Sequence, residues 1–340
     1  MAIGTTADDS RSQHLDRLSI LGKYMASSTW ARARWRFGHT EFDSGSTHRG
    51  LRLDQSLAYV QRVFDDYSNV GGLTLDVLRG SRVLEVGPGD NLGVALCFIA
   101  AGSAKVVCVD RCHSRRDPAE EQLIYAALRQ KLGGAATGAL DSVMDEQGHL
   151  MQGSGALHYV AGVDIANAAT VANGGSFDCI VSRAVLEEIW ELDRAFVAMD
   201  HLLKPGGWMV HRVDLRDYGM FSKRGFHPLE FLTIPDHLYR WIAKGVGRPN
   251  RRRIDYYRSM TAKLGYRTKI YVTRIAGHDE ELVPRRERLV YGQDYDASTL
   301  ALIQSIRPRL ARPFRRLADS DLMIAGIFLV AQKGCGNPGA

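Results

Sequence analysis

The sequence predicts an α/β protein with a seven-stranded, mostly parallel sheet and helices on both faces. Two observations support this fold class. From about residue 82 to residue 215, short apolar runs that fit buried strands alternate with segments of helical spacing, which is typical of βαβ units. A glycine-rich turn, Gly87-Pro88-Gly89, joins the first strand to the helix that follows. We also expect a helical N-terminal cap before the sheet and an inserted, lid-like segment after its fifth strand.

Each element follows from a local pattern. The predicted strands are 82–86, 104–109, 157–163, 177–182, 208–215, 267–273 and 322–332. Helical spacing is found at 51–67, 91–101, 120–132, 192–203 and 254–264. The helix after the fourth strand should end at Lys204-Pro205-Gly206-Gly207, because glycine adopts left-handed geometry and proline blocks continuation. The predicted units are a helical cap (1–70), a core (71–217), an insertion that serves as a substrate lid (218–253) and a completion of the fold (254–340).

The composition indicates a globular protein with reduced cysteines. Of its 340 residues, 45% are hydrophobic and 24% are charged, which excludes disordered and fibrous classes. Five scattered cysteines favour free thiols in a cytosolic protein. Residues 1–13 carry no apolar signal core, and no apolar stretch reaches the roughly 20 residues that span a bilayer. We therefore expect a cytoplasmic location and no membrane span; the oligomeric state is not predicted.

The strongest motif is the strand, turn and helix at 83–93. Gly87 and Gly89 let a ligand approach the backbone, and the start of the helix offers free N–H groups. The next strand ends in Asp110, about 20 residues further on, where an acid accepts hydrogen bonds from both hydroxyls of a ribose. The alternative is that Asp110 only caps a turn. Glu85 would repel a pyrophosphate but would attract a cationic ammonium group.

These motifs resemble, in order and spacing, those of class I S-adenosylmethionine (SAM)-dependent methyltransferases. The resemblance covers about Leu75 to Leu215 and rests on the Glu-x-Gly-x-Gly turn, on Asp110, on Phe177-Asp178 and on the Lys-Pro-Gly-Gly turn. It implies a Rossmann-like fold and SAM as cofactor. Asn91 replaces the third glycine of the usual pattern, and asparagine tolerates left-handed geometry.

The resemblance also implies which residues bind the cofactor. Asp164, at the end of the third strand, matches the acid that contacts the adenine amino group, although it could instead be a strand-end cap. The predicted cofactor-binding residues are Glu85, Gly87, Pro88, Gly89, Asn91, Asp110, Arg111, Asp164 and Ser182.

Candidate catalytic residues lie at the expected carboxyl ends of strands four and five, where ligands bind in such sheets. Glu187 and Glu188 follow strand four, and His211 and Asp214 lie near the end of strand five. His211 is the leading candidate for a general base, since its unperturbed pKa is about 6.5. A divalent ion such as Mg²⁺ on these carboxylates is a second hypothesis that the sequence does not require.

The sequence does not name the methyl acceptor. We expect a small molecule or glycan, methylated on a hydroxyl oxygen. The formal charge of +6 and the basic runs 251–253 and 285–288 allow an anionic acceptor, or are simply solvated. Ser182-Arg183-Ala184-Val185 stands where nucleic-base and amide N-methyltransferases carry Asn/Asp-Pro-Pro-Tyr, which argues against nucleic acid. The alternatives are an RNA or protein N-methyltransferase, a non-catalytic SAM-binding protein and, last, an NAD(P)-dependent oxidoreductase.

Overall fold

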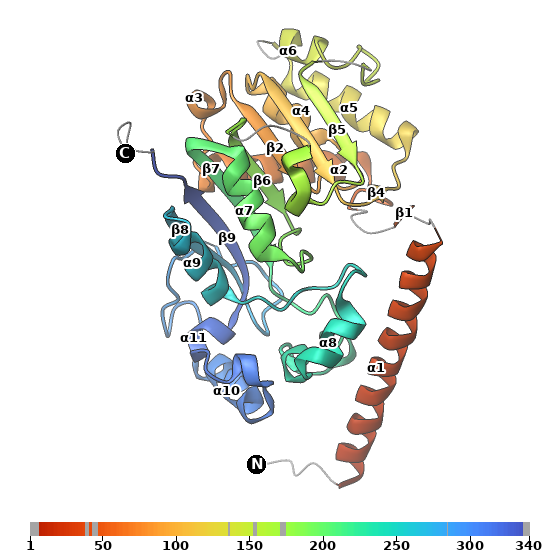
Figure 1. The fold of residues 1–340 in the computed structure, drawn as a ribbon, viewed down its shortest axis with the longest axis vertical. Helices are drawn as coiled ribbons and strands as arrows, with labels where there is room; N and C mark the ends of the chain where they lie inside the picture. Colours follow the sequence, from red (N-terminus) through yellow and green to blue (C-terminus); the bar gives the residue numbers. More distant parts are fainter. Residues whose placement is uncertain are drawn as a thin grey trace.

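The computed structural model describes residues 7–37, 41–42, 47–134, 137–151, 155–170, 175–283 and 285–335. At its centre is a seven-stranded sheet with the order β5-β3-β2-β6-β7-β9-β8 (Figure 1). The strands are β2 (Arg82–Val86), β3 (Lys105–Asp110), β5 (Leu157–Ala161), β6 (Phe177–Arg183), β7 (Leu203–Asp214), β8 (Arg267–Ile275) and β9 (Ile324–Gln332). The first five pair in parallel, and β9 runs antiparallel between β7 and β8. The predicted fold class is confirmed.

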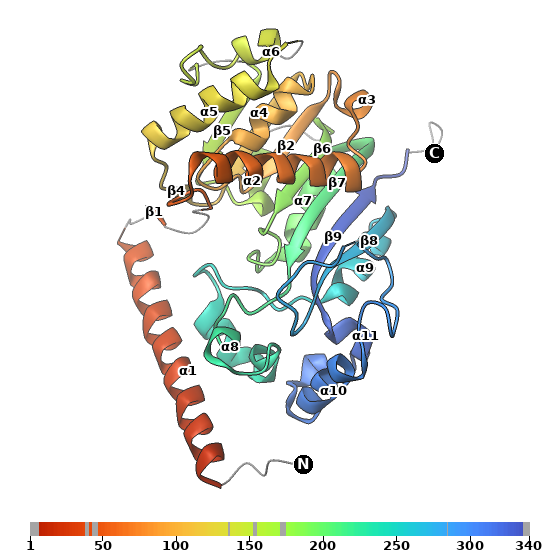
Figure 2. The same ribbon diagram turned by 180° about the vertical axis from the view of Figure 1, so that it is seen from behind.

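Helices cover both faces of this sheet and enclose two hydrophobic cores (Figures 1 and 2). One face carries α2 (Leu53–Asp65), α4 (Gly93–Ala100) and α5 (Pro118–Leu132), and the other carries α7 (Leu192–Leu202) and α9 (Ile254–Lys263). Successive side chains of a strand point to opposite faces. Val83 of β2 therefore packs in the core of α4, whereas Leu84 packs in the core of α7. α4 is apolar and buried because it lies between the sheet and α2.

The remaining elements lie at the edges of the sheet or away from it. The helices are α1 (Ala7–Arg36), α3 (Leu75–Leu78), α6 (Thr137–Asp141), α8 (Asp236–Ala243), α10 (Ala297–Ile306) and α11 (Asp319–Leu322). A π-helical turn, Asp66–Val70, extends α2, and 3₁₀ turns lie at Ile165–Thr170, Ser222–Arg224, Glu230–Thr233, Arg307–Arg309 and Arg312–Phe314. The short strands β1 (Glu41–Phe42) and β4 (His113–Ser114) pair in parallel. Within the described ranges, no helix is both long and apolar enough to cross a membrane.

β7 is longer than the sequence predicts. It begins at Leu203 rather than Trp208, so the Lys-Pro-Gly-Gly turn lies inside the strand. Gly206 adopts a φ of +79° there, and the pairing with β6 shifts register between Phe177 and Cys179. Proline is tolerated in a strand at such an irregularity, because the regular ladder is already interrupted.

A third hydrophobic cluster lies at the end of β8 and the beginning of β9 and includes residues of α1, α8, α10 and α11; α1 packs along α8 (Figure 1). Most of its residues come from α1, 220–243 and 303–325. The predicted insertion, 218–253, thus shares a third core with α1 and with residues 303–325. Its role as a substrate lid remains a prediction.

Two arginines of the basic run 251–253 are structural and do not form the anion site or solvated face considered above. Arg251 is buried and donates to the carbonyls of Phe231 and Ile234. Arg253 is 1% exposed and donates to the carbonyls of Leu215, Leu322 and Ile324. The side chain of Arg253 therefore joins the end of β7 to the beginning of β9.

Arg253→Leu should lower the free energy of unfolding by about 3 kcal/mol or more, because three carbonyls lose a charged donor. The exposed neighbour provides a matched control, since Arg252→Leu should change stability by less than about 0.5 kcal/mol. Urea denaturation measures both values. Equally small losses in the two variants would show that the buried bonds contribute no net stability.

Candidate active site

A pocket of about 460 Å³ opens at the carboxyl ends of β2, β3, β5 and β6. The strand order reverses between β2 and β6, and the segments that leave these two strands diverge. Ligands in open α/β sheets bind at such a switch point. Eight predicted cofactor-binding residues line the pocket: Glu85, Gly87, Pro88, Gly89, Asn91, Asp110, Arg111 and Asp164.

The turn after β2 is shaped by a close approach of the chain at Gly87. This glycine has a φ of +69°, which L-residues with a side chain rarely adopt. A Cβ atom at position 87 would stand 2.5 Å from Cγ2 of Val185, in the segment that follows β6. Glycine is therefore required both by conformation and by space.

Glu85 lies at the floor of the pocket and is 6% exposed. Its Oε2 atom is 3.5 Å from the Cys108 thiol, which donates to it. Burial raises the pKa of Glu85 to about 7. A cationic group placed beside this carboxyl would favour its ionised form, so the site suits an ammonium.

Asp110 and Asp164 supply acceptors on the β3 and β5 side of the pocket. Asp110 accepts from the Cys112 backbone N–H at 3.3 Å and from the Ser114 hydroxyl at 3.4 Å. Burial raises the pKa of Asp110. Asp164 accepts from the backbone N–H of Ala166 at 2.9 Å. Both carboxylates thus cap turns and also line the pocket. A capping role and a ligand-binding role are therefore compatible for each of them.

Asn91 keeps the turn intact by a different route from the one predicted. Asn91 does not have a positive φ, so it does not take the left-handed conformation that a glycine would adopt there. Its side-chain oxygen instead accepts from the Gly93 backbone N–H at 2.7 Å. This bond satisfies a free donor at the start of α4.

Ser182 and His211 do not lie where the sequence placed them. Both are fully buried in neighbouring strands, where the Ser182 hydroxyl lies 2.8 Å from His211 Nδ1. Neither residue lines the pocket. β7 continues to Asp214 and is paired on both sides, so His211 is inside the sheet rather than at its edge. Burial lowers the pKa of His211 to about 3, which removes it as a general base near neutral pH.

Only Glu188 of the four predicted catalytic residues lines the pocket. Glu187 is 1% exposed and accepts from the Asp214 backbone N–H at 3.0 Å and the Tyr218 hydroxyl at 2.9 Å. Burial raises the pKa of Glu187 well above its usual range, and the residue does not line the pocket. Asp214 is paired with Arg216 at 2.6 Å, outside the pocket.

Several lining residues were not predicted from the sequence. Arg183 ends β6, Trp190 follows that strand, Tyr59 comes from α2, and the turn Lys244–Gly247 follows α8. The indole Nε1 of Trp190 is buried and has no hydrogen-bond partner among the described residues, so it is available to a ligand acceptor. The sequence offered one signal for these residues: the two glycines of Lys244-Gly245-Val246-Gly247 would let the backbone approach a ligand closely.

The carboxylates of this region do not form a metal site. Within the described ranges, no group of three or more His, Cys, Asp or Glu side chains could hold a metal ion. The Mg²⁺ hypothesis therefore has no ligand set to support it.

Comparison with known families identifies the class of protein. Residues 58–261, more than half of the chain, match the family described as "Methyltransferase domain". The chain belongs to the class I SAM-dependent methyltransferases. Its pocket fits that cofactor, since it combines the glycine turn, two acceptor carboxylates and the Glu85 carboxyl. No curated protein matches the chain.

Two solved structures are among those similar to this chain. A SAM-dependent methyltransferase from Mesorhizobium loti is 15% identical, with a TM-score of 0.39, over 83% of this chain and 100% of the other. A phosphoethanolamine N-methyltransferase 2 from Haemonchus contortus, in complex with SAM, is 15% identical, with a TM-score of 0.41, over 90% of this chain and 57% of the other. Because these values are low, the acceptor is inferred below from this chain's own residues.

Asp110→Ala should weaken SAM binding at least tenfold, because each charge-assisted hydrogen bond contributes about 1.5–3 kcal/mol. Asp76→Ala, at an exposed position of α3, is the matched control and should bind normally. Titration calorimetry with SAM measures both affinities. Unchanged SAM affinity in Asp110→Ala would show that Asp110 only caps a turn and does not bind the cofactor.

Proposed function

We propose that this methyltransferase transfers the methyl group of SAM to a hydroxyl oxygen of a small molecule or glycan, with Glu188 as general base. The observation that carries the proposal is the position of Glu188. It is the only residue of the four predicted catalytic ones that lines the cofactor pocket, and it follows β6 at the opposite side from Asp164.

The cofactor orientation follows from the distribution of acceptors. Asp110 would accept from the ribose hydroxyls and Asp164 from the adenine amino group, which places the adenosine over β3 and β5. Glu85, on the neighbouring β2, would hold the methionine ammonium. The methyl group is then directed to the β6 side, where Arg183, Val185 and Glu188 stand.

Glu188 has the properties that a base needs at this place. Burial raises its pKa, which brings the carboxylate closer to the basicity that suits proton removal near neutral pH. A hydrogen bond from Tyr218 and the charges of Arg111 and Arg248 act in the opposite direction on this pKa. Trp190, which also lines the pocket, helps to exclude water from this side.

SAM supplies an activated methyl group. The acceptor oxygen forms a bond to the methyl carbon while the carbon–sulfur bond breaks, and the electron pair of that bond leaves with sulfur in S-adenosylhomocysteine. Glu188 takes the hydroxyl proton. The chain's main contribution is alignment, since an in-line displacement depends on position and orientation.

Glu188→Gln should lower turnover by about 10²–10⁴-fold with little change in SAM affinity, because a positioned base contributes that much. Glu146→Gln, at an exposed site, should keep full activity. The assay uses deuterated-methyl SAM and a low-molecular-weight metabolite extract, with mass spectrometry of the products. Near-normal turnover in Glu188→Gln would place the base elsewhere, and SAM binding without any labelled product would contradict the enzymatic proposal.

The affinity for SAM should depend on pH through Glu85. Its folded-state pKa is about 7, so the carboxyl is neutral at pH 6 and mostly ionised at pH 7.5. An α-amino group, with a pKa of about 8, stays mainly protonated over this range. SAM binding should therefore strengthen several-fold from pH 6 to pH 7.5. Calorimetry on Glu85→Gln should show weak, pH-independent binding; an identical pH profile in this variant would exclude the assigned contact.

A further inference from the structure

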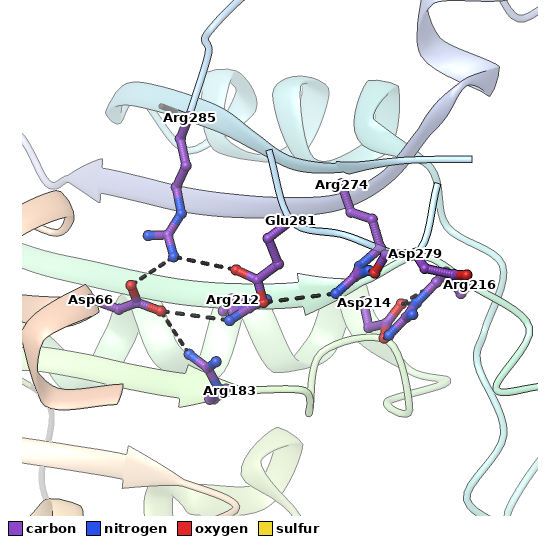
Figure 3. A network of polar contacts seen from close by, with 9 residues as sticks. All are labelled: Asp66, Arg183, Arg212, Asp214, Arg216, Arg274, Asp279, Glu281 and Arg285. Carbon is purple, nitrogen blue, oxygen red and sulfur yellow. Dashed lines mark hydrogen bonds and ion pairs between the residues drawn. The ribbon is translucent and has the colours of Figure 1, made fainter. Parts of the chain in front are cut away.

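A cluster of four arginines lies beside the β6 end of the pocket. Its members are Arg183, Arg212, Arg274 and Arg285, which surround the carboxylates of Asp66 and Glu281 (Figure 3). The arginines come from β6, β7, β8 and position 285. The two acids come from the π-helical turn that extends α2 and from position 281. Residues far apart in the sequence thus converge on one place, and we call this group the arginine cluster.

The ion pairs in the cluster leave positive charge in excess. The carboxylate of Asp66 forms ion pairs with three arginines, with N···O distances of 2.9 Å to Arg183, 2.6 Å to Arg285 and 3.6 Å to Arg212. Glu281 pairs with Arg212 and lies 3.8 Å from both Arg274 and Arg285. Four guanidinium groups face two carboxylates, so two positive charges are not balanced within the cluster.

This excess charge is only partly solvated. The side chains of the four arginines are each 13–14% exposed. The Nη1 atom of Arg285 is buried and has no hydrogen-bond partner among the described residues, and the buried Nη1 atom of Arg212 has only the 3.6 Å ion pair with Asp66. Burial and the charge of Arg183 lower the pKa of Arg212. Buried donors that lack acceptors are costly, which favours binding of an anion at this place.

The cluster is connected to the active site through Arg183. Arg183 is the last residue of β6 and lines the pocket, and its guanidinium carbon lies 5.6 Å from the ring centroid of Tyr59, another lining residue. With the adenosine on the β3 and β5 side, this is the part of the pocket left for the acceptor. Guanidinium groups present paired donors that match phosphate, sulfate and carboxylate oxygens.

We propose that the arginine cluster binds the anionic group of the methyl acceptor, a phosphate monoester whose charge of about −2 matches the excess. The inference rests on the proposed function for the location of the acceptor. It differs from the function of the cofactor pocket, because Arg212 and Arg285 do not line that pocket.

Binding of inorganic sulfate, measured by calorimetry with saturating S-adenosylhomocysteine and constant ionic strength, tests the proposal without turnover. Wild type should bind sulfate saturably. Arg285→Gln should weaken this binding about tenfold, since a charge-assisted contact is lost. Glu281→Gln adds one net positive charge and should strengthen it. Arg52→Gln, which removes an exposed arginine paired with Asp54, is the matched control and should bind sulfate as wild type does.

Three results would overturn the inference. Wild type without saturable sulfate binding would show that the cluster is a closed structural network, and this result does not depend on whether a variant folds. Competition between sulfate and S-adenosylhomocysteine would assign the cluster to the carboxylate of the cofactor. A methylated product that carries no anionic group would exclude the acceptor role. The proposed O-methyltransferase function fails separately, by the absence of any labelled product.

Discussion

The parallel pairing of β2 with β6 is the constraint on which the active site depends. These strands are neighbours in the sheet but are separated by almost a hundred residues, and the segments that follow them diverge. The two segments come close where Gly87 faces Val185, since a Cβ atom at position 87 would stand 2.5 Å from Val185 Cγ2. A residue larger than glycine at position 87 would separate the two segments. The floor of the pocket, the orientation of α4 and the position of Glu188 therefore all follow from one pairing and one close contact.

The sheet could be predicted because buried parallel strands are short apolar runs with turn-forming or polar residues at both ends. Asp110 and Asp164 follow such runs, so their place at the carboxyl edge could be deduced from chain order alone. The location of His211 could not be deduced in this way. The predicted strand, 208–215, already contained His211, but the pattern of a strand does not reveal which of its side chains the rest of the fold covers. β6 and β9 pair with β7 on both sides of His211, and the side chain is fully buried. His211 therefore changed from an edge residue to an interior one.

Residues that come from outside the core were the least predictable. Tyr59 and the turn Lys244–Gly247 reach the pocket through packing between segments distant in sequence, which no local pattern reports. The sequence alone also did not distinguish the roles of arginines in the basic runs. Arg253 is a buried donor to three carbonyls, whereas Arg285 lies among acids and other arginines. The same residue type thus stabilises the backbone at one position and accumulates charge at another.

The position of β9 between β7 and β8 has a consequence for synthesis on the ribosome. β2, β3, β5, β6 and β7 all emerge before β9, so the strands that carry the cofactor pocket can pair while translation continues. Until β9 emerges, one edge of β7 exposes unpaired N–H and C=O groups over Trp208–Asp214. Exposed edges of this kind recruit other chains. The nascent protein is then most prone to aggregation in the interval between the emergence of β7 and that of β9, and chaperones that cover strand edges would act in this interval.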